Sequence, residues 1–147
     1  MYFVDREKIE QALKCYEAGW AKRAVLSGDE TTRDLAVERI GFLLIESVID
    51  VGNSVIDGFI MRDPGSYEDI IEILEDEKVV DGPLAESLKR LVALRTLIVR
   101  SFVEASAGRV DTVLDMNEQQ LKRFPQEIRR YLETELGPVS AFLPIEE

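Results

Sequence analysis

An arginine in the middle of an apolar helical stripe is the residue of this sequence that most demands a chemical explanation. On a helical wheel of about 100° per residue, Arg95 shares one side of the stretch 84–102 with apolar residues: Leu88, Leu91, Ile98, Val99 and Phe102. A buried guanidinium is costly unless it is paired and hydrogen-bonded, and its planar fork of donors fits a carboxylate or a phosphate. We therefore expect Arg95 either to pair with a carboxylate of a neighbouring helix or to line an anion-binding cleft.

Arg100 is a second cation on the same predicted helix. It should point roughly 140° away from Arg95, and a second apolar edge, made by Ala93, Leu94 and Leu97, faces that other way. Since one bundle core cannot absorb both edges, the pattern predicts a subunit interface along this helix, most simply a two-fold dimer. The arginines of both protomers would then gather in one groove. The alternative for Arg100 is a solvated charge near a helix end.

Four polar residues interrupt the long apolar stretch that precedes this helix. Glu46, Asp50, Asn53 and Asp57 follow one another at spacings of four, three and four residues, which places their side chains on one helical face. Three interpretations of the strip remain open: an exposed seam of the helix, the polar wall of a cleft opposite Arg95, or part of a Mg²⁺ site. The third is included because carboxylates bind this ion. A metal site would need a second acidic cluster from residues 68–76, and we predict none.

The composition narrows the classes of site and partner. The sequence contains no histidine, which removes the commonest general base and the commonest transition-metal ligand. Its single cysteine, Cys15, allows no intrachain disulfide and favours a reducing cytoplasm. The net charge of −11 argues against DNA as a partner and against a broad basic footprint for RNA, although a local basic groove remains compatible with it. We expect no cofactor, no signal peptide and no membrane span.

Apolar periodicity predicts helices throughout and no strand. The predicted helices span about residues 5–26, 32–61, 67–77, 83–102 and 109–136, the second capped by Thr31 or Thr32 and the last kinked or split by Pro125. The second helix is apolar almost all round and should therefore be central. The sequence predicts one all-α domain over residues 1–147, a bundle of four to five helices with a core of about 5–136 and a C-terminal tail, 137–147.

Three segments together resemble the HepT-like family of the HEPN superfamily. The segment LKRLVALRTLIVRSF has the spacing of the family signature, which is Arg, four residues, His, any residue and Tyr, and here it reads Arg95, Arg100 and Phe102. The stretch IESVIDVGNSVIDGF is similar to the family's Asp-x-x-Asn helix and contains Asp50 and Asn53. The stretch MRDPGSYEDIIEIL matches the family's Pro-Ser-Tyr turn. The chain ends look closest to the uncharacterised YutE-type branch.

The resemblance implies a small helical HEPN-type homodimer, often a ribonuclease toxin paired with a nucleotidyltransferase-type antitoxin. Arg100 stands where the family has its catalytic histidine, and Phe102 stands where it has a tyrosine that some antitoxins modify by adding a nucleotide. Arginine stays protonated, so it does not serve as a general base. Phenylalanine has no hydroxyl that accepts a nucleotide. The two departures predict an impaired ribonuclease site.

We therefore expect a catalytically impaired HEPN dimer that binds a nucleotide, RNA or a partner protein in a groove near its two-fold axis. In this hypothesis Arg95 anchors the anion, Asp50 and Asn53 hold its side chain, and Arg100 adds a second charge. The remaining candidates for the groove are Glu46, Asp57 and Tyr67. One alternative is an active, metal-independent endoribonuclease toxin that uses a carboxylate such as Asp50 as its base. A second alternative is a Mg²⁺-dependent nucleotide hydrolase built on the acidic strip.

Overall fold

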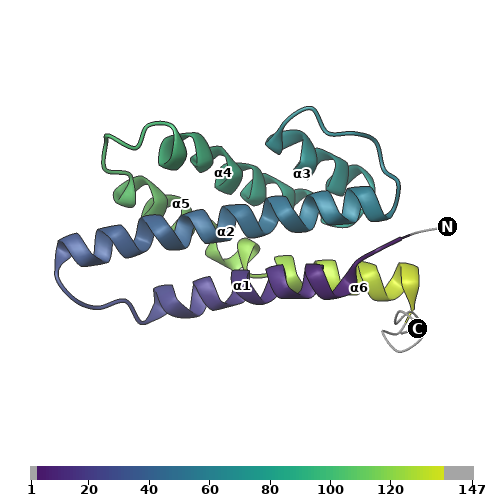
Figure 1. The fold of residues 1–147 in the computed structure, drawn as a ribbon, viewed down its shortest axis with the longest axis horizontal. Helices are drawn as coiled ribbons and strands as arrows, with labels where there is room; N and C mark the ends of the chain where they lie inside the picture. Colours follow the sequence, from purple (N-terminus) through teal and green to yellow (C-terminus); the bar gives the residue numbers. More distant parts are fainter. Residues whose placement is uncertain (1–2, 138–147) are drawn as a thin grey trace.

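The computed structural model describes residues 3–137, and these residues form a bundle of six helices without a strand (Figure 1). The helices are α1 (Arg6–Ala24), α2 (Glu30–Gly58), α3 (Tyr67–Asp76), α4 (Gly82–Val99), α5 (Ala107–Leu121) and α6 (Phe124–Leu136). The all-α prediction is confirmed. The last predicted helix is split into α5 and α6, and Pro125 lies in the first turn of α6, where a missing amide hydrogen does no harm. The predicted tail from residue 138 onward lies outside the described residues.

Helix α2 is the central element, as its apolar surface predicted. Figure 1 shows α2 crossing the whole molecule, with α1 and α6 along one side and α3 and α4 along the other. It packs against α1, α3, α4 and α5. Gly41 allows a close approach of α5, because a Cβ atom added there would lie 2.8 Å from Cγ1 of Val110. The fully buried residues of α2 include Val37, Leu44, Ile45, Val48, Val51 and Val55.

Side-chain caps set the beginnings of four helices. A carboxylate or hydroxyl accepts a hydrogen bond from the backbone amide three residues later, which satisfies a donor that has no partner inside the helix. The four capping residues are Asp5, Asp29, Ser66 and Asp81. The predicted cap of the second helix was wrong: Asp29 caps α2, so the helix begins before Thr31, and the amide of Thr32 donates to Asp29.

Helix α4 ends at Val99, earlier than predicted. The backbone amides of Arg100 and Ser101 both donate to the carbonyl of Thr96, at 2.9 and 3.1 Å, so the regular ladder of hydrogen bonds stops there. The chain must turn at this point because α5 packs back along α4. Phe102 therefore lies in the turn and is 77% exposed, not on the buried face of the helix where the wheel placed it.

The second apolar edge of α4 faces α5 of the same chain. Leu94 is only 5% exposed, and Leu97 packs partly buried against the core. Together with Val113 of α5 they line a groove between the two helices. Helix α5 covers this second edge only in part, because Leu94 is buried but Ala93 is exposed and lines the groove. The predicted subunit interface along α4 stays a prediction.

Within residues 3–137 the helices are too short or too polar to span a lipid bilayer. This agrees with the charged residues that interrupt α2, among them Glu46 and Asp50.

Candidate functional site

Arg95 is held between the central helix and the beginning of α3. Its Nε donates a 2.7 Å hydrogen bond to Oε1 of Glu46, and its guanidinium carbon lies 4.9 Å from the centroid of the Tyr67 ring. The ring face attracts the cation and fixes the plane of the guanidinium. The bond to Glu46 raises the pKa of Arg95 above its ordinary value, so the residue stays charged. Arg95 therefore has a carboxylate partner on a neighbouring helix, which is the first of the two arrangements expected from the sequence.

The same geometry leaves part of the guanidinium available. The Arg95 side chain is 26% exposed, and its two terminal nitrogens make no hydrogen bond with the residues that the structure describes. Glu46 is the carboxylate that lies within ion-pair distance of it in this part of the chain. An anion that approaches from solvent therefore meets a guanidinium whose Nε edge is occupied and whose outer edge is free. This arrangement favours binding of a phosphate or carboxylate group.

Asp50 and Asn53 do not hold Arg95, and this part of the prediction was wrong. Oδ1 of Asp50 lies 3.7 Å from Nζ of Lys8, so this carboxylate pairs with α1. Asn53 is exposed and makes no side-chain hydrogen bond with residues 3–137. Each helical turn shifts a residue by about 5.4 Å along α2. Arg95 therefore contacts Glu46, which lies at the same level of the bundle. Asp50 and Asn53 lie one and two turns further along α2, beyond the reach of its side chain.

Arg100 and Phe102 lie outside the Arg95 cluster. Arg100 is the C-terminal capping residue of α4, is exposed, and has no side-chain partner among residues 3–137. Phe102 follows in the turn. The structure thus brings together Arg95, Glu46 and Tyr67 and separates them from both other signature positions within one chain. Asp57, also predicted for this site, is exposed on α2.

The acidic strip of α2 does not form a metal site with the acids of α3. Asp69 binds Arg62 at 2.9 Å, and Glu72 lies 3.4 Å from Lys89. Among residues 3–137 no three acidic or cysteine side chains come together in a way that would hold an ion. The described residues therefore do not provide the paired acidic clusters that the alternative of a Mg²⁺-dependent nucleotide hydrolase requires.

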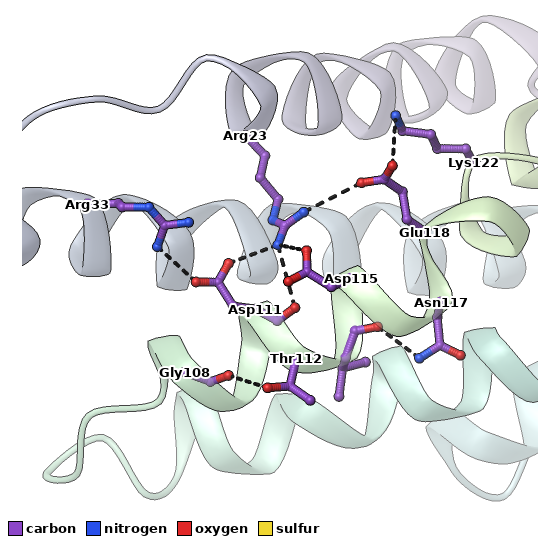
Figure 2. Close-up of polar contacts among 10 residues, drawn as sticks. Arg23, Arg33, Gly108, Asp111, Thr112, Asp115, Asn117, Glu118 and Lys122 are labelled. Atoms are coloured by element: carbon purple, nitrogen blue, oxygen red, sulfur yellow. Dashed lines mark hydrogen bonds and ion pairs between the residues drawn. The ribbon is translucent and has the colours of Figure 1, made fainter.

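The densest ionic network lies elsewhere, where α1 and α2 meet α5 (Figure 2). Nη2 of Arg23 lies 2.9 Å from Asp111 and 2.6 Å from Asp115, and Nη1 lies 3.6 Å from Glu118. Arg33 binds the other oxygen of Asp111 at 2.8 Å. Burial opposes ionisation of Asp111, but hydrogen bonds from Arg33 and Arg23 hold the pKa of its carboxyl below the usual value. This network, which we call the Arg23 network, joins three helices.

The sequence reasoning missed the role of Glu46 as the direct partner of Arg95, although it included Glu46 in the polar strip. The signal that points to Glu46 is its place at the crossing of α2 and α4, which no periodicity reveals. The reasoning also missed the buried pair Ser87 and Asn117, whose oxygen atoms lie 3.0 Å apart between α4 and α5. A polar residue at an apolar helical position is the signal that was available for Asn117.

Known proteins similar to this chain place it in a family. Residues 6–128 match the family model described as "Ribonuclease HepT-like". The chain is 49% identical over 143 residues to "Putative RNase YutE" of Bacillus subtilis (strain 168), which covers 97% of this chain and 99% of that protein.

Solved structures agree with this placement. The structure of YutE, described as a cytosolic protein of unknown function, aligns with a TM-score of 0.92 at 49% identity over 97% of this chain and 100% of the other. A crystal structure of a toxin–antitoxin with AMP-PNP aligns with a TM-score of 0.71 at 21% identity, over 82% of this chain and 96% of that one, and shares the fold. The sequence and the fold agree, and the chain belongs to the HepT-like family of the HEPN superfamily.

Proposed function

We propose that this protein is a HEPN-type dimer that binds RNA, a nucleotide or a partner protein through Arg95 and has lost all or nearly all metal-independent ribonuclease activity. The observation that carries the proposal is the arginine at position 100 in a chain without histidine. Metal-independent RNA cleavage needs a group that takes and returns a proton near neutral pH. A guanidinium stays protonated throughout that range and lacks this capacity.

Arg95 remains equipped to bind a phosphate. Glu46 occupies its Nε and Tyr67 lies against its plane, so the side chain is oriented before a ligand arrives. A preorganised donor loses less conformational entropy on binding than a free surface arginine. The two terminal nitrogens are the atoms that we assign to the anion. Glu46 acts as a positioning residue for Arg95.

The dimer in this proposal uses the C-terminal end of α4. Val99, Phe102 and Val103 are exposed apolar side chains at this end, next to Arg100. Three exposed apolar side chains within five residues are typical of an interaction surface. A two-fold axis near the patch would bring Arg100 of both protomers toward one groove.

A nucleotidyltransferase-type antitoxin is the protein partner that fits a HepT-like chain, and a cytoplasmic location fits its single cysteine. Phe102 is exposed, so the position is accessible, but its ring offers no hydroxyl. We expect incubation with such a partner and ATP to leave residues 95–109 without a nucleotide adduct by mass spectrometry. An adduct in this segment would contradict this part of the proposal.

An active endoribonuclease is the second candidate, and one contact favours it. The Glu46 carboxylate lies 2.7 Å from Arg95 and is partly exposed, so it, and not Asp50, is the carboxylate placed to act as a base. In this alternative Glu46 takes a proton and Arg95 stabilises the developing charge on phosphate. The two candidates make opposite predictions for one assay.

The deciding assay incubates the purified chain with single-stranded RNA in EDTA and examines both cleavage and filter retention. The proposal expects intact RNA and a saturable retention that falls at least tenfold in Arg95→Ala. Lys14→Ala, an exposed lysine of α1 without an ion pair among residues 3–137, serves as the matched control and should retain RNA normally. Chelator-insensitive cleavage that is lost in both Arg95→Ala and Glu46→Gln would establish the alternative.

A further inference from the structure

A groove between α4 and α5 has the properties of a separate ligand site. Its volume is about 450 Å³, within the range of roughly 300–1,000 Å³ that is usual for small-ligand pockets. Ala93 and Leu97 contribute apolar surface, Thr96 and Ser101 contribute hydroxyls, and Arg90 and Arg109 contribute guanidinium groups. Leu97 lies two residues after Arg95, roughly 200° around α4. The groove therefore opens on the side of α4 away from the Arg95 cluster.

The charge of this groove is opposite to that of the chain. The sequence has 29 acidic and 18 basic residues, yet no aspartate or glutamate is among the described residues that line the groove. Arg109 is exposed and has no carboxylate partner or side-chain hydrogen bond among residues 3–137. Most other arginines are paired with carboxylates, so an unpaired arginine at the rim of an acid-free groove leaves local positive potential there.

Arg90 is positioned by buried polar groups, and its Nη2 also lies 3.9 Å from Oε2 of Glu86, one turn earlier on α4. Its Nη1 donates to Oδ1 of Asn117 at 3.0 Å, and Ser87 Oγ donates to the same oxygen at 3.0 Å. Nδ2 of Asn117 in turn donates to the carbonyl of Val113 at 2.8 Å, a contact drawn in Figure 2. Both Ser87 and Asn117 are buried. A buried amide between two packed helices reduces apolar packing, so its satisfied bonds point to a role, which here is to orient Arg90.

These features together define the ligand. Guanidinium groups form paired hydrogen bonds with phosphate oxygens, the two hydroxyls add donors, and the apolar surface accommodates a flat ring. We propose that the α4–α5 groove binds a phosphate monoester carried on a flat ring, of the size of a nucleoside monophosphate. Arg109 binds the phosphate beside the hydroxyls of Thr96 and Ser101, and the ring lies over Ala93 and Leu97, toward Arg90. This site is independent of the one proposed at Arg95.

The test is calorimetric titration of the full chain with AMP, adenosine and inorganic phosphate. We expect AMP to bind at one site per chain, and adenosine and phosphate each to bind at least tenfold more weakly, because each lacks one half of the ligand. Arg109→Ala should weaken AMP binding at least tenfold, and Arg109→Lys should weaken it less. Arg39→Ala removes an exposed arginine of α2 that has no carboxylate partner among residues 3–137, and should leave AMP binding unchanged.

A second variant separates a shaped groove from a merely positive surface. Ala93→Trp fills the groove while both arginines remain, so it should abolish AMP binding and leave the circular dichroism spectrum unchanged. The proposal is overturned if AMP does not saturate a site, if Arg109→Ala and Arg39→Ala weaken binding equally, or if Ala93→Trp binds AMP normally. The proposal is also overturned if the parent chain does not bind AMP and Ala93→Trp no longer forms a dimer. The groove would then be a contact between subunits. RNA retention that depends on Arg95 is measured separately, so either site can fail alone.

Discussion

Two arginines of this bundle, Arg23 and Arg95, bridge helices through carboxylates, and they do so in different ways. The Arg23 side chain is 10% exposed and faces Asp111, Asp115 and Glu118. The Arg95 side chain is 26% exposed and faces one carboxylate and one aromatic ring. The terminal nitrogens of Arg23 are engaged inside the protein, whereas those of Arg95 have no hydrogen bond with the described part of the chain.

This difference separates a structural arginine from the one that we propose to bind an anion. A guanidinium whose charge is balanced by several carboxylates has little left to offer a ligand, but its removal leaves those carboxylates facing one another. A guanidinium held at one edge contributes little to stability because its single ion pair is partly exposed. It can nevertheless bind an anion at its free edge. The predictions below test this assignment from the largest expected effect to the smallest.

Restoring the family signature should have the largest effect on ribonuclease activity. Arg100→His combined with Phe102→Tyr recreates the spacing Arg, four residues, His, any residue, Tyr. A positioned general acid–base group contributes about 10²–10⁴-fold to a rate, so we expect chelator-insensitive RNA cleavage to appear, with a pH dependence near the imidazole pKa of about 6.5. The measurement is a denaturing gel across pH 5 to 8. An equal rate for the double variant and the parent chain would show that position 100 does not limit cleavage.

Replacing Arg23 should have the largest effect on stability. We expect Arg23→Ala to lower the free energy of unfolding by about 2–3 kcal/mol, because Asp111, Asp115 and Glu118 lose their shared cation while staying close together. Urea denaturation at neutral pH measures this loss. Lys22→Ala, at the exposed neighbouring position, should change stability by less than about 0.5 kcal/mol. Equal losses of unfolding free energy in the two variants would contradict a structural role for Arg23.

The reciprocal experiment compares the same two arginines in RNA retention. Arg95→Ala should lower retention at least tenfold while costing less than about 1 kcal/mol of stability, because its pair with Glu46 is partly exposed. Arg23→Ala should retain RNA normally at temperatures where it remains folded. If both variants lose retention in proportion to their loss of stability, the contrast between the two regions is wrong.

Acid titration of Asp111, a member of the Arg23 network, should produce the smallest effect. Hydrogen bonds from Arg33 and Arg23 depress the pKa of Asp111 in the folded chain. A depressed carboxyl pKa stabilises the fold above the unfolded value, about 3.9, and this contribution is lost as the pH falls through the folded value. Asp111→Asn should therefore be less stable than the parent at pH 7, and the difference should shrink below about pH 4. A difference that is the same at pH 7 and pH 3 would mean that the charge of Asp111 is not what stabilises the network.

Much of the fold could be predicted from local patterns. The apolar periodicity placed the helices, the break at Pro125 separated α5 from α6, and the almost wholly apolar α2 had to be central. The end of α4 could not be predicted in this way, because the apolar pattern continues through Phe102 while the chain turns after Val99. The turn is set by the packing of α5 on α4, which is a long-range contact.

The sequence alone determined which chemical groups this protein possesses: no histidine, an arginine at position 100, a phenylalanine at position 102 and a single cysteine. Side-chain chemistry is a property of the residue, so these facts limit catalysis whatever the fold. Only the tertiary structure decided that Glu46 holds Arg95, that α5 packs beside the second apolar edge of α4 and leaves a groove there, and that Asn117 binds Arg90. Each of these contacts joins residues from different helices. Their distances depend on how the helices cross, and the periodicity within one helix does not encode that crossing.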